Sequence, residues 1–119
     1  MNKTIYHYQI KDGILLDAVK DSLLISIMAV ESLFGRSRIN LEARFRLEKM
    51  NRVCIIDVGT LIGETIARVF TGLLIREFSE QAFKVDRIET SVEVETTAEE
   101  LETVMRDAHA LLSSDTVEI

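Results

Sequence analysis

The sequence is 119 residues long, with 47% hydrophobic and 29% charged residues and a net charge of −6. This length and composition exclude an extensively disordered chain and predict one α+β domain over residues 1–119, with 113–119 as a frayed tail. The single cysteine, Cys54, excludes an intramolecular disulfide and favours a reducing compartment, so we expect a cytoplasmic protein. No secretory signal opens the chain and no apolar run reaches the ~20 residues of a membrane span, so we expect no membrane association.

The charges are unevenly distributed along the chain. Residues 36–52 hold six basic and two acidic residues, whereas residues 86–119 hold ten acidic and two basic ones. Nonspecific nucleic-acid binding depends on many phosphate contacts, and an acidic chain with one modest basic stretch is a poor candidate for it. We therefore expect no nucleic-acid partner. The two oppositely charged stretches suit each other, within one chain or between two.

The first two predicted elements are a strand and a long helix. Residues 4–10, TIYHYQI, are rich in β-branched and aromatic side chains that alternate, which is typical of a strand. After the break KDG, residues 14–34 have helical spacing. Asp12 is positioned to cap the first turn, and Gly35 stands where a left-handed residue ends a helix.

The predicted helix 14–34 is apolar on more than one side. The stripe suited to a sheet consists of Leu23, Ile27, Val30 and Phe34. Leu24 and Met28 lie outside this stripe, and large apolar side chains that remain exposed together commonly mark an interface. We therefore predict a homodimer with Leu24 and Met28 at its interface. The alternative is that a later helix of the same chain covers them.

Residues 37–49, SRINLEARFRLEK, alternate strictly between apolar and polar side chains, which predicts a half-buried strand. Its polar face would carry Arg36, Arg38, Asn40, Glu42, Arg44, Arg46 and Glu48. A guanidinium group binds carboxylates and phosphates through two parallel hydrogen bonds. Arg36, Arg38, Arg44 and Arg46 are therefore a candidate anion-binding or partner-binding face. The alternative is a solvated row with weak local ion pairs.

A turn at residues 49–52, with Asn51 in the left-handed conformation, would join this strand to the apolar strand 52–58. Thr60 is then positioned to cap a second helix over residues 61–81. The turn residues Asp57, Thr60 and Gly63 form a second candidate site, because glycine permits close backbone approach and the free amides of a helix N-terminus bind anions. The alternative is an ordinary capped turn.

Residues 83–95 predict one long strand or two short ones, with a bulge or turn near residues 89–91. Residues 97–112 predict a third helix that opens with a capping box formed by Thr97 and Glu100. The order β-α-β-β-α-β-α predicts a two-layer sandwich in which a four-stranded, mostly antiparallel sheet carries its helices on one face, as in a ferredoxin-like plait. If the first strand is irregular or the last one splits, the order becomes α-β-β-α-β-β-α.

Motifs for catalysis, metal binding and phosphate binding are absent from the sequence. The two histidines, His7 and His109, stand apart from any partner motif. We therefore expect no catalytic residue, cofactor or metal ion. The predicted function is a non-enzymatic, homodimeric interaction or regulatory module. The alternative is a small ligand-binding protein or enzyme with an anion pocket at the subunit interface.

Overall fold

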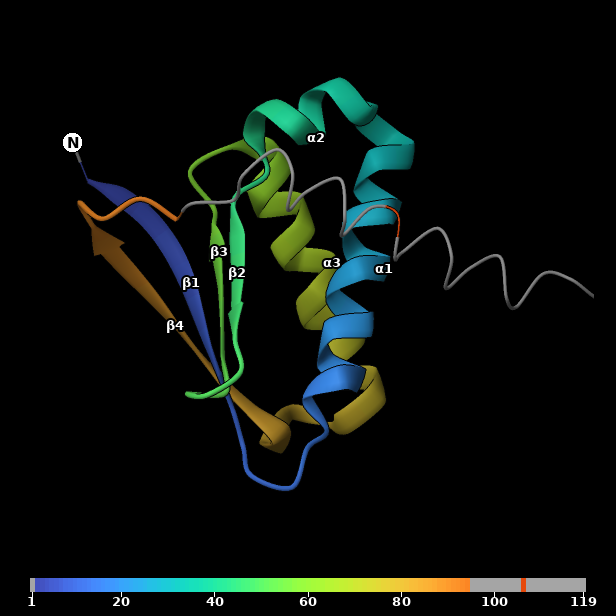
Figure 1. Ribbon diagram of the computed structural model, residues 1–119, viewed down its shortest axis with the longest axis vertical. Helices are drawn as coiled ribbons and strands as arrows, with labels where there is room; N and C mark the ends of the chain where they lie inside the picture. Colours follow the sequence, from blue (N-terminus) through green and yellow to red (C-terminus); the bar gives the residue numbers. More distant parts are fainter. Residues whose placement is uncertain (1, 95–105, 107–119) are drawn as a thin grey trace, which may run out of the picture.

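A computed structural model describes residues 2–94 and Arg106. Its four strands form one antiparallel sheet in the order β2-β3-β1-β4. The strands are β1 (Lys3–Ile10), β2 (Phe45–Glu48), β3 (Val53–Asp57) and β4 (Phe83–Thr90). The long helices α1 (Leu16–Phe34) and α3 (Leu61–Phe78) pack on one face of the sheet (Figure 1). This arrangement confirms the predicted α+β fold with helices on one face.

The order of elements departs from the prediction at two places within the described residues. A short helix, α2 (Arg36–Glu42), stands between α1 and β2, and a single 3-10 turn, η1 (Glu80–Ala82), precedes β4. The predicted third helix, with its capping box of Thr97 and Glu100, lies outside the described residues except for Arg106, and so does the tail 113–119.

The described residues do not support the alternative order α-β-β-α-β-β-α, which required an irregular first strand or a split last strand. β1 is a regular strand of eight residues, and β4 is a second one that runs without interruption from Phe83 to Thr90. The chain bends at residues 91–92, directly after β4, whereas the sequence predicted a bulge or turn near residues 89–91.

The core lies between the sheet and the two long helices. Tyr8 of β1 is fully buried at its centre, with its ring centroid 5.0 Å from that of Phe70 on α3. The Tyr8 hydroxyl lies 2.8 Å from Thr71 Oγ1. Strand alternation places every second residue of each strand on this face, and each long helix adds one apolar stripe. The buried helical residues include Leu23, Ile27, Val30, Ile62, Ile66, Phe70 and Leu74.

The predicted strand over residues 37–49 is wrong in its first half, where the chain forms α2. Ile39 and Ala43 are fully buried, and their spacing of four residues is that of one helical face. Gly35, with a φ of 90°, ends α1 through its N–H bond to the Glu31 carbonyl and redirects the chain into α2. Only residues 45–48 remain as strand β2.

Two local details of the neighbouring turns also differ from the prediction. Helix α1 begins at Leu16 with Leu15 at its N-cap, and Asp12 makes no capping hydrogen bond. In the turn before β3, the left-handed residue is Arg52, with a φ of 55°, rather than Asn51. The Arg52 guanidinium donates to the Lys11 and Ile14 carbonyls, so the side chain ties this turn to the loop that precedes α1.

Leu24 and Met28 are not a surface-exposed pair. Leu24 is only 4% exposed, and Met28 is half-buried against the core. The sequence assigned these two residues to a dimer interface because it expected them to be exposed, and their burial removes that reason. The exposed large apolar residues of α1 are Ile25 and Leu33. Among the described residues, no helix has both the length and the apolar character that crossing a membrane requires.

The core predicts a loss of stability at alkaline pH. Burial raises the pKa of the Cys54 thiol from 9.0 to about 12, and burial raises the pKa of Tyr8 from 10.0 to about 12 despite its hydrogen bond to Thr71. Each group binds its proton more tightly when folded, so its contribution to stability is complete below the unfolded pKa and is lost as pH rises toward the folded one. We expect the free energy of unfolding to fall from about pH 9 upward.

Denaturant titrations of the wild-type chain and of Cys54→Ala check this expectation. The variant should reduce the decline most clearly near pH 9, the unfolded pKa of Cys54, because Tyr8, with an unfolded pKa of 10.0, is still mostly protonated there. An identical decline in both chains would contradict the assignment to Cys54.

Candidate functional site

The four arginines proposed as an anion-binding face do not share a face. Arg36 and Arg38 lie on α2, Arg44 lies in the connection to β2, and Arg46 lies on β2. Three of them form ion pairs, Arg36 with Glu31 at 2.6 Å, Arg38 with Glu42 at 3.0 Å and Arg46 with Glu48 at 3.6 Å. Arg44 donates to the Ala43 carbonyl at 2.8 Å. The prediction of a common face is wrong because α2 rotates its arginines away from the strand.

The second candidate site, the turn of Asp57, Thr60 and Gly63, is assembled as a capped strand-to-helix connection. Thr60 Oγ1 accepts from the Gly63 N–H at 3.0 Å, and Asp57 Oδ1 accepts from the Gly59 N–H at 2.8 Å. The Lys3 ammonium lies 3.9 Å from Asp57 Oδ2. The chain's own oxygens therefore occupy amides that an anion would need, and the carboxylate of Asp57 adds a negative charge beside them.

Gly63 has a packing role in this turn. A Cβ at this position would overlap the backbone carbonyl of Asp57, so only glycine lets the first turn of α3 lie against the end of β3. This contact fixes where α3 begins relative to the sheet. It thereby places Glu64, the next residue, on one wall of an adjoining pocket.

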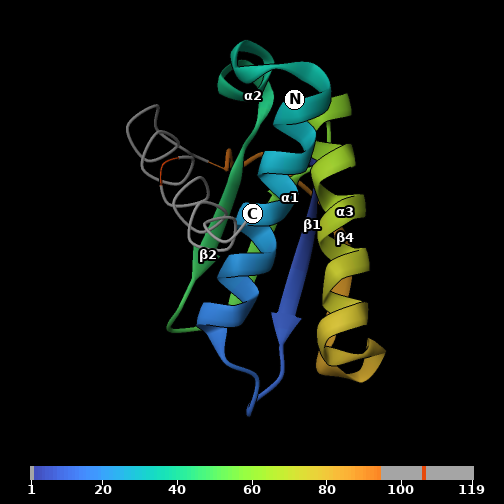
Figure 2. The same ribbon diagram turned by 90° about the vertical axis from the view of Figure 1, so that its right-hand side faces the viewer.

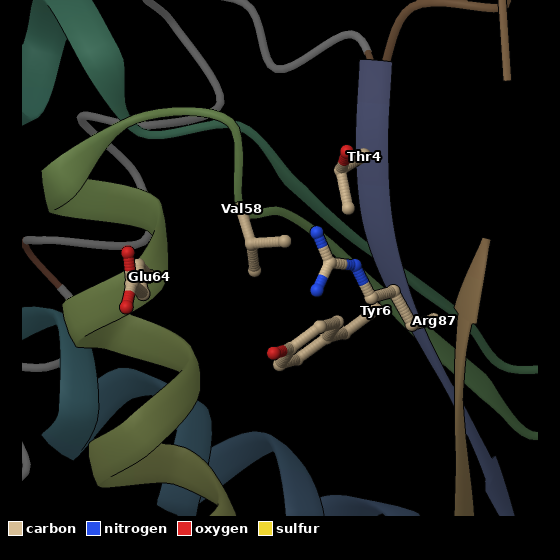
Figure 3. Close-up of a pocket in the computed structure, with 5 residues that line it drawn as sticks. All are labelled: Thr4, Tyr6, Val58, Glu64 and Arg87. Carbon is tan, nitrogen blue, oxygen red and sulfur yellow. The ribbon is translucent and has the colours of Figure 1, made fainter. Parts of the chain in front are cut away.

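The pocket lies between the first turns of α3 and the sheet, and it has a volume of about 280 Å³ (Figure 3). Its lining residues are Thr4, Tyr6, Val58, Glu64 and Arg87. The β1–β4 register sets Arg87 directly opposite Tyr6. In Figure 3 the Arg87 guanidinium reaches across Tyr6 toward α3, while Glu64 stands on the far wall.

Most polar groups of the pocket have no protein partner in the described part of the chain. The side chains of Thr4 and Arg87 and the Tyr6 hydroxyl make no hydrogen bond or ion pair there. Glu64 pairs with Arg68, one turn farther along α3, at 3.1 Å. That pair is largely exposed, with side-chain exposures of 78% for Arg68 and 48% for Glu64, so it is weak.

Sequence reasoning missed all five lining residues. They come from four separate segments, and only the strand register and the position of α3 bring them together. The one available signal was the charge of Arg87 within the predicted strand 83–95, on the same phase as Val85. A register between β1 and β4 would have been needed to place it beside Tyr6.

A second exposed surface is the outer edge of β4. This strand lies at the end of the sheet, and residues 84–89 are all exposed. The even-numbered residues of β1 direct their backbone N–H and C=O groups toward β3. Two hydrogen bonds show this, from Ile10 N to Arg52 O at 2.9 Å and from Val58 N to Thr4 O at 3.0 Å. The odd-numbered residues of β1 therefore bond to β4, where they oppose even-numbered residues. By alternation, Val85, Arg87 and Glu89 direct their backbone groups to the open edge.

The described part of the chain contains no group of three histidine, cysteine or acidic side chains arranged to hold a metal ion. No family model matches this chain, and comparison with curated proteins and with solved structures gives no match either.

Two glycines of α3 give a matched test of the packing contact. We expect Gly63→Ala to destabilise the fold by roughly 1–3 kcal/mol, since the new Cβ displaces the Asp57 carbonyl. Gly72→Ala, with open space around its Cα, should stabilise it by roughly 0.5–1 kcal/mol through helix propensity. Chemical denaturation measures both. Equal effects of the two substitutions would rule out the contact as the constraint.

Proposed function

We propose that this chain is a non-enzymatic interaction module that forms a homodimer through the open edge of β4. The observation that carries the proposal is an eight-residue edge strand whose central six residues are all exposed. Unpaired N–H and C=O groups along such an edge are a template for a further strand. The other edge strand, β2, has four residues and offers a shorter template.

The side chains of β4 favour a second copy of the same strand as the partner. A twofold axis perpendicular to the sheet pairs β4 with itself in antiparallel orientation and keeps each residue on its own face. If the axis passes at Ile88, Arg87 of each subunit stands opposite Glu89 of the partner subunit, and the two Ile88 side chains meet. Opposite charges and apolar pairs placed directly across from each other stabilise an antiparallel ladder.

Neighbouring registers are disfavoured by charge. An axis at Arg87 places two arginines opposite each other, and an axis at Asp86 does the same with two carboxylates. An axis at Val85 avoids like charges and forms Lys84–Asp86 pairs. We favour the Ile88 register over it because isoleucine offers more apolar surface than valine and because Arg–Glu pairs can be bidentate.

The dimer is expected to be a reversible one. Pairing over residues 86–90 buries less surface than the roughly 1,200–2,000 Å² of stable complexes. The charged residues of β4 also keep the isolated edge soluble. An exchangeable partner of this kind fits a regulatory interaction module better than a permanent assembly does.

Single cysteines report the register directly. Residues that face each other in a non-hydrogen-bonded antiparallel pair have Cα atoms about 4.5 Å apart, which is within the roughly 4.4–6.8 Å span of disulfides. We expect Ile88→Cys to form a disulfide-linked dimer under mild oxidation, whereas Val85→Cys, Asp86→Cys and Arg87→Cys do not. The buried Cys54 of the wild-type chain leaves a clean background on a non-reducing gel.

Light scattering at increasing concentration completes the test. We expect Ile88→Lys to weaken the dimer at least tenfold, because it places two ammonium groups opposite each other. Met50→Lys replaces another exposed apolar residue, in the β2–β3 turn, and should leave association unchanged. Cross-linking at Val85 alone would overturn the Ile88 register, and a monomer at every concentration would overturn the proposed function.

A further inference from the structure

We propose that the pocket between α3 and the β1–β4 pair binds a small zwitterion, with the carboxylate and ammonium groups of a free amino acid. The pocket is formed within one chain, so this inference does not rest on the proposed dimer. Three features of the pocket favour such a ligand: opposite charges on its two walls, polar groups without partners in the described residues, and a small volume.

The sheet wall of the pocket presents hydrogen-bond donors. Arg87 extends from β4 over Tyr6, and Thr4 stands two residues before Tyr6 on the same face of β1 (Figure 3). A guanidinium group with hydroxyl groups nearby is a suitable binding site for a carboxylate, which accepts two parallel N–H bonds and further hydroxyl bonds. In the described residues these donors have no competing acceptor.

The helix wall presents the opposite charge. Glu64 lies in the first turn of α3, and its partner Arg68 approaches from the exposed side of the helix. Exposed i,i+4 pairs contribute little free energy, so a ligand ammonium group can replace or join Arg68. Glu64 would repel a phosphate or a dicarboxylate, and Arg87 would repel a simple amine. The two walls together therefore favour a ligand that carries both charges.

Size and lining limit the ligand further. A volume of about 280 Å³ lies just below the roughly 300–1,000 Å³ range of small-molecule sites, so the ligand is compact. The Tyr6 ring and Val58 supply apolar surface between the charged walls. Polar atoms form most of the lining, so the two charged groups of the ligand, rather than its side chain, carry the recognition, and leucine serves as the first probe.

The walls are held by contacts that do not involve a ligand. The Thr60 cap and the Gly63 packing contact fix the first turn of α3, and eight consecutive β1–β4 residue pairs fix Arg87 opposite Tyr6. The charged groups are therefore positioned before binding, which lowers the cost of ordering them.

Calorimetric titration with three related probes tests the charge requirement. Leucine carries both charges, N-acetyl-leucine lacks the ammonium group and leucinamide lacks the carboxylate. We expect leucine to bind at least about tenfold more tightly than either derivative, as expected for the loss of one charged hydrogen bond. The remaining standard amino acids are screened by thermal shift, since a ligand that prefers the folded chain raises its stability.

Variants locate the binding site. Glu64→Gln and Arg87→Gln should each weaken amino-acid binding at least about tenfold. Glu77→Gln and Arg76→Gln change exposed residues near the other end of α3 and should leave it unchanged. Glu64→Gln should also remove the difference between leucine and N-acetyl-leucine, which a merely structural role of Glu64 would not do.

Binding is measured in Ile88→Lys as well, because Arg87 also lies on the proposed dimer edge. If Ile88→Lys binds the amino acid as tightly as the wild-type chain does, or more tightly, the result supports a site within one chain, whether or not the chain is dimeric. Loss of binding there overturns the single-chain site. The inference is also overturned if none of the standard amino acids binds at millimolar concentration, or if binding survives both Glu64→Gln and Arg87→Gln.

Discussion

The contact between Tyr8 and α3 is the constraint on which the rest of the structure depends. Tyr8 stands on β1, the strand that pairs with both β3 and β4, and its ring packs edge-on against Phe70. Its hydroxyl bonds to Thr71 in a buried setting, where leaving that hydroxyl without a partner would be costly. One side chain thus sets both the height and the rotation of α3 over the sheet. Strand twist then carries the later residues of β4 away from α3, which leaves the pocket and the open edge (Figure 1). The turned view shows α1 and α3 side by side in front of the sheet (Figure 2).

The sequence predicted well those elements whose periodicity has one interpretation. The alternation of residues 4–10 and the stripe from Leu23 to Phe34 fit one element type each, and the Thr60 cap and the Gly35 helix end follow from local chemistry. Residues 36–43 fit two element types, a strand and a helix. Ile39 and Ala43 are apolar at a spacing of four, which satisfies a strand and a helix equally. A tertiary contact, the hydrogen bond from Thr60 Oγ1 to the Glu42 carbonyl, belongs only to the helical arrangement, and local pattern does not contain it.

The candidate sites were predicted less well, and for a related reason. Asp57, Thr60 and Gly63 were correctly grouped because they are close in sequence, but their hydrogen bonds serve the turn itself. The pocket residues are far apart along the chain, and their grouping is a consequence of register. Shifting β4 by one residue against β1 would turn Arg87 to the outer face of the sheet, away from Tyr6. No local pattern encodes that register, so the site becomes visible only with the fold.

The pocket and the edge are two consequences of one exposed strand, and Arg87 belongs to both. Its side chain points toward α3, whereas its backbone groups face the open edge. In the proposed dimer the guanidinium also lies within reach of the partner subunit's Glu89. A ligand carboxylate and that glutamate would then draw on the same cation. Whenever two partners compete for one group, each lowers the affinity of the other by the same factor. An amino acid in the pocket would thus loosen the dimer, and dimerisation would loosen the amino acid, so that a single arginine couples ligand binding to association.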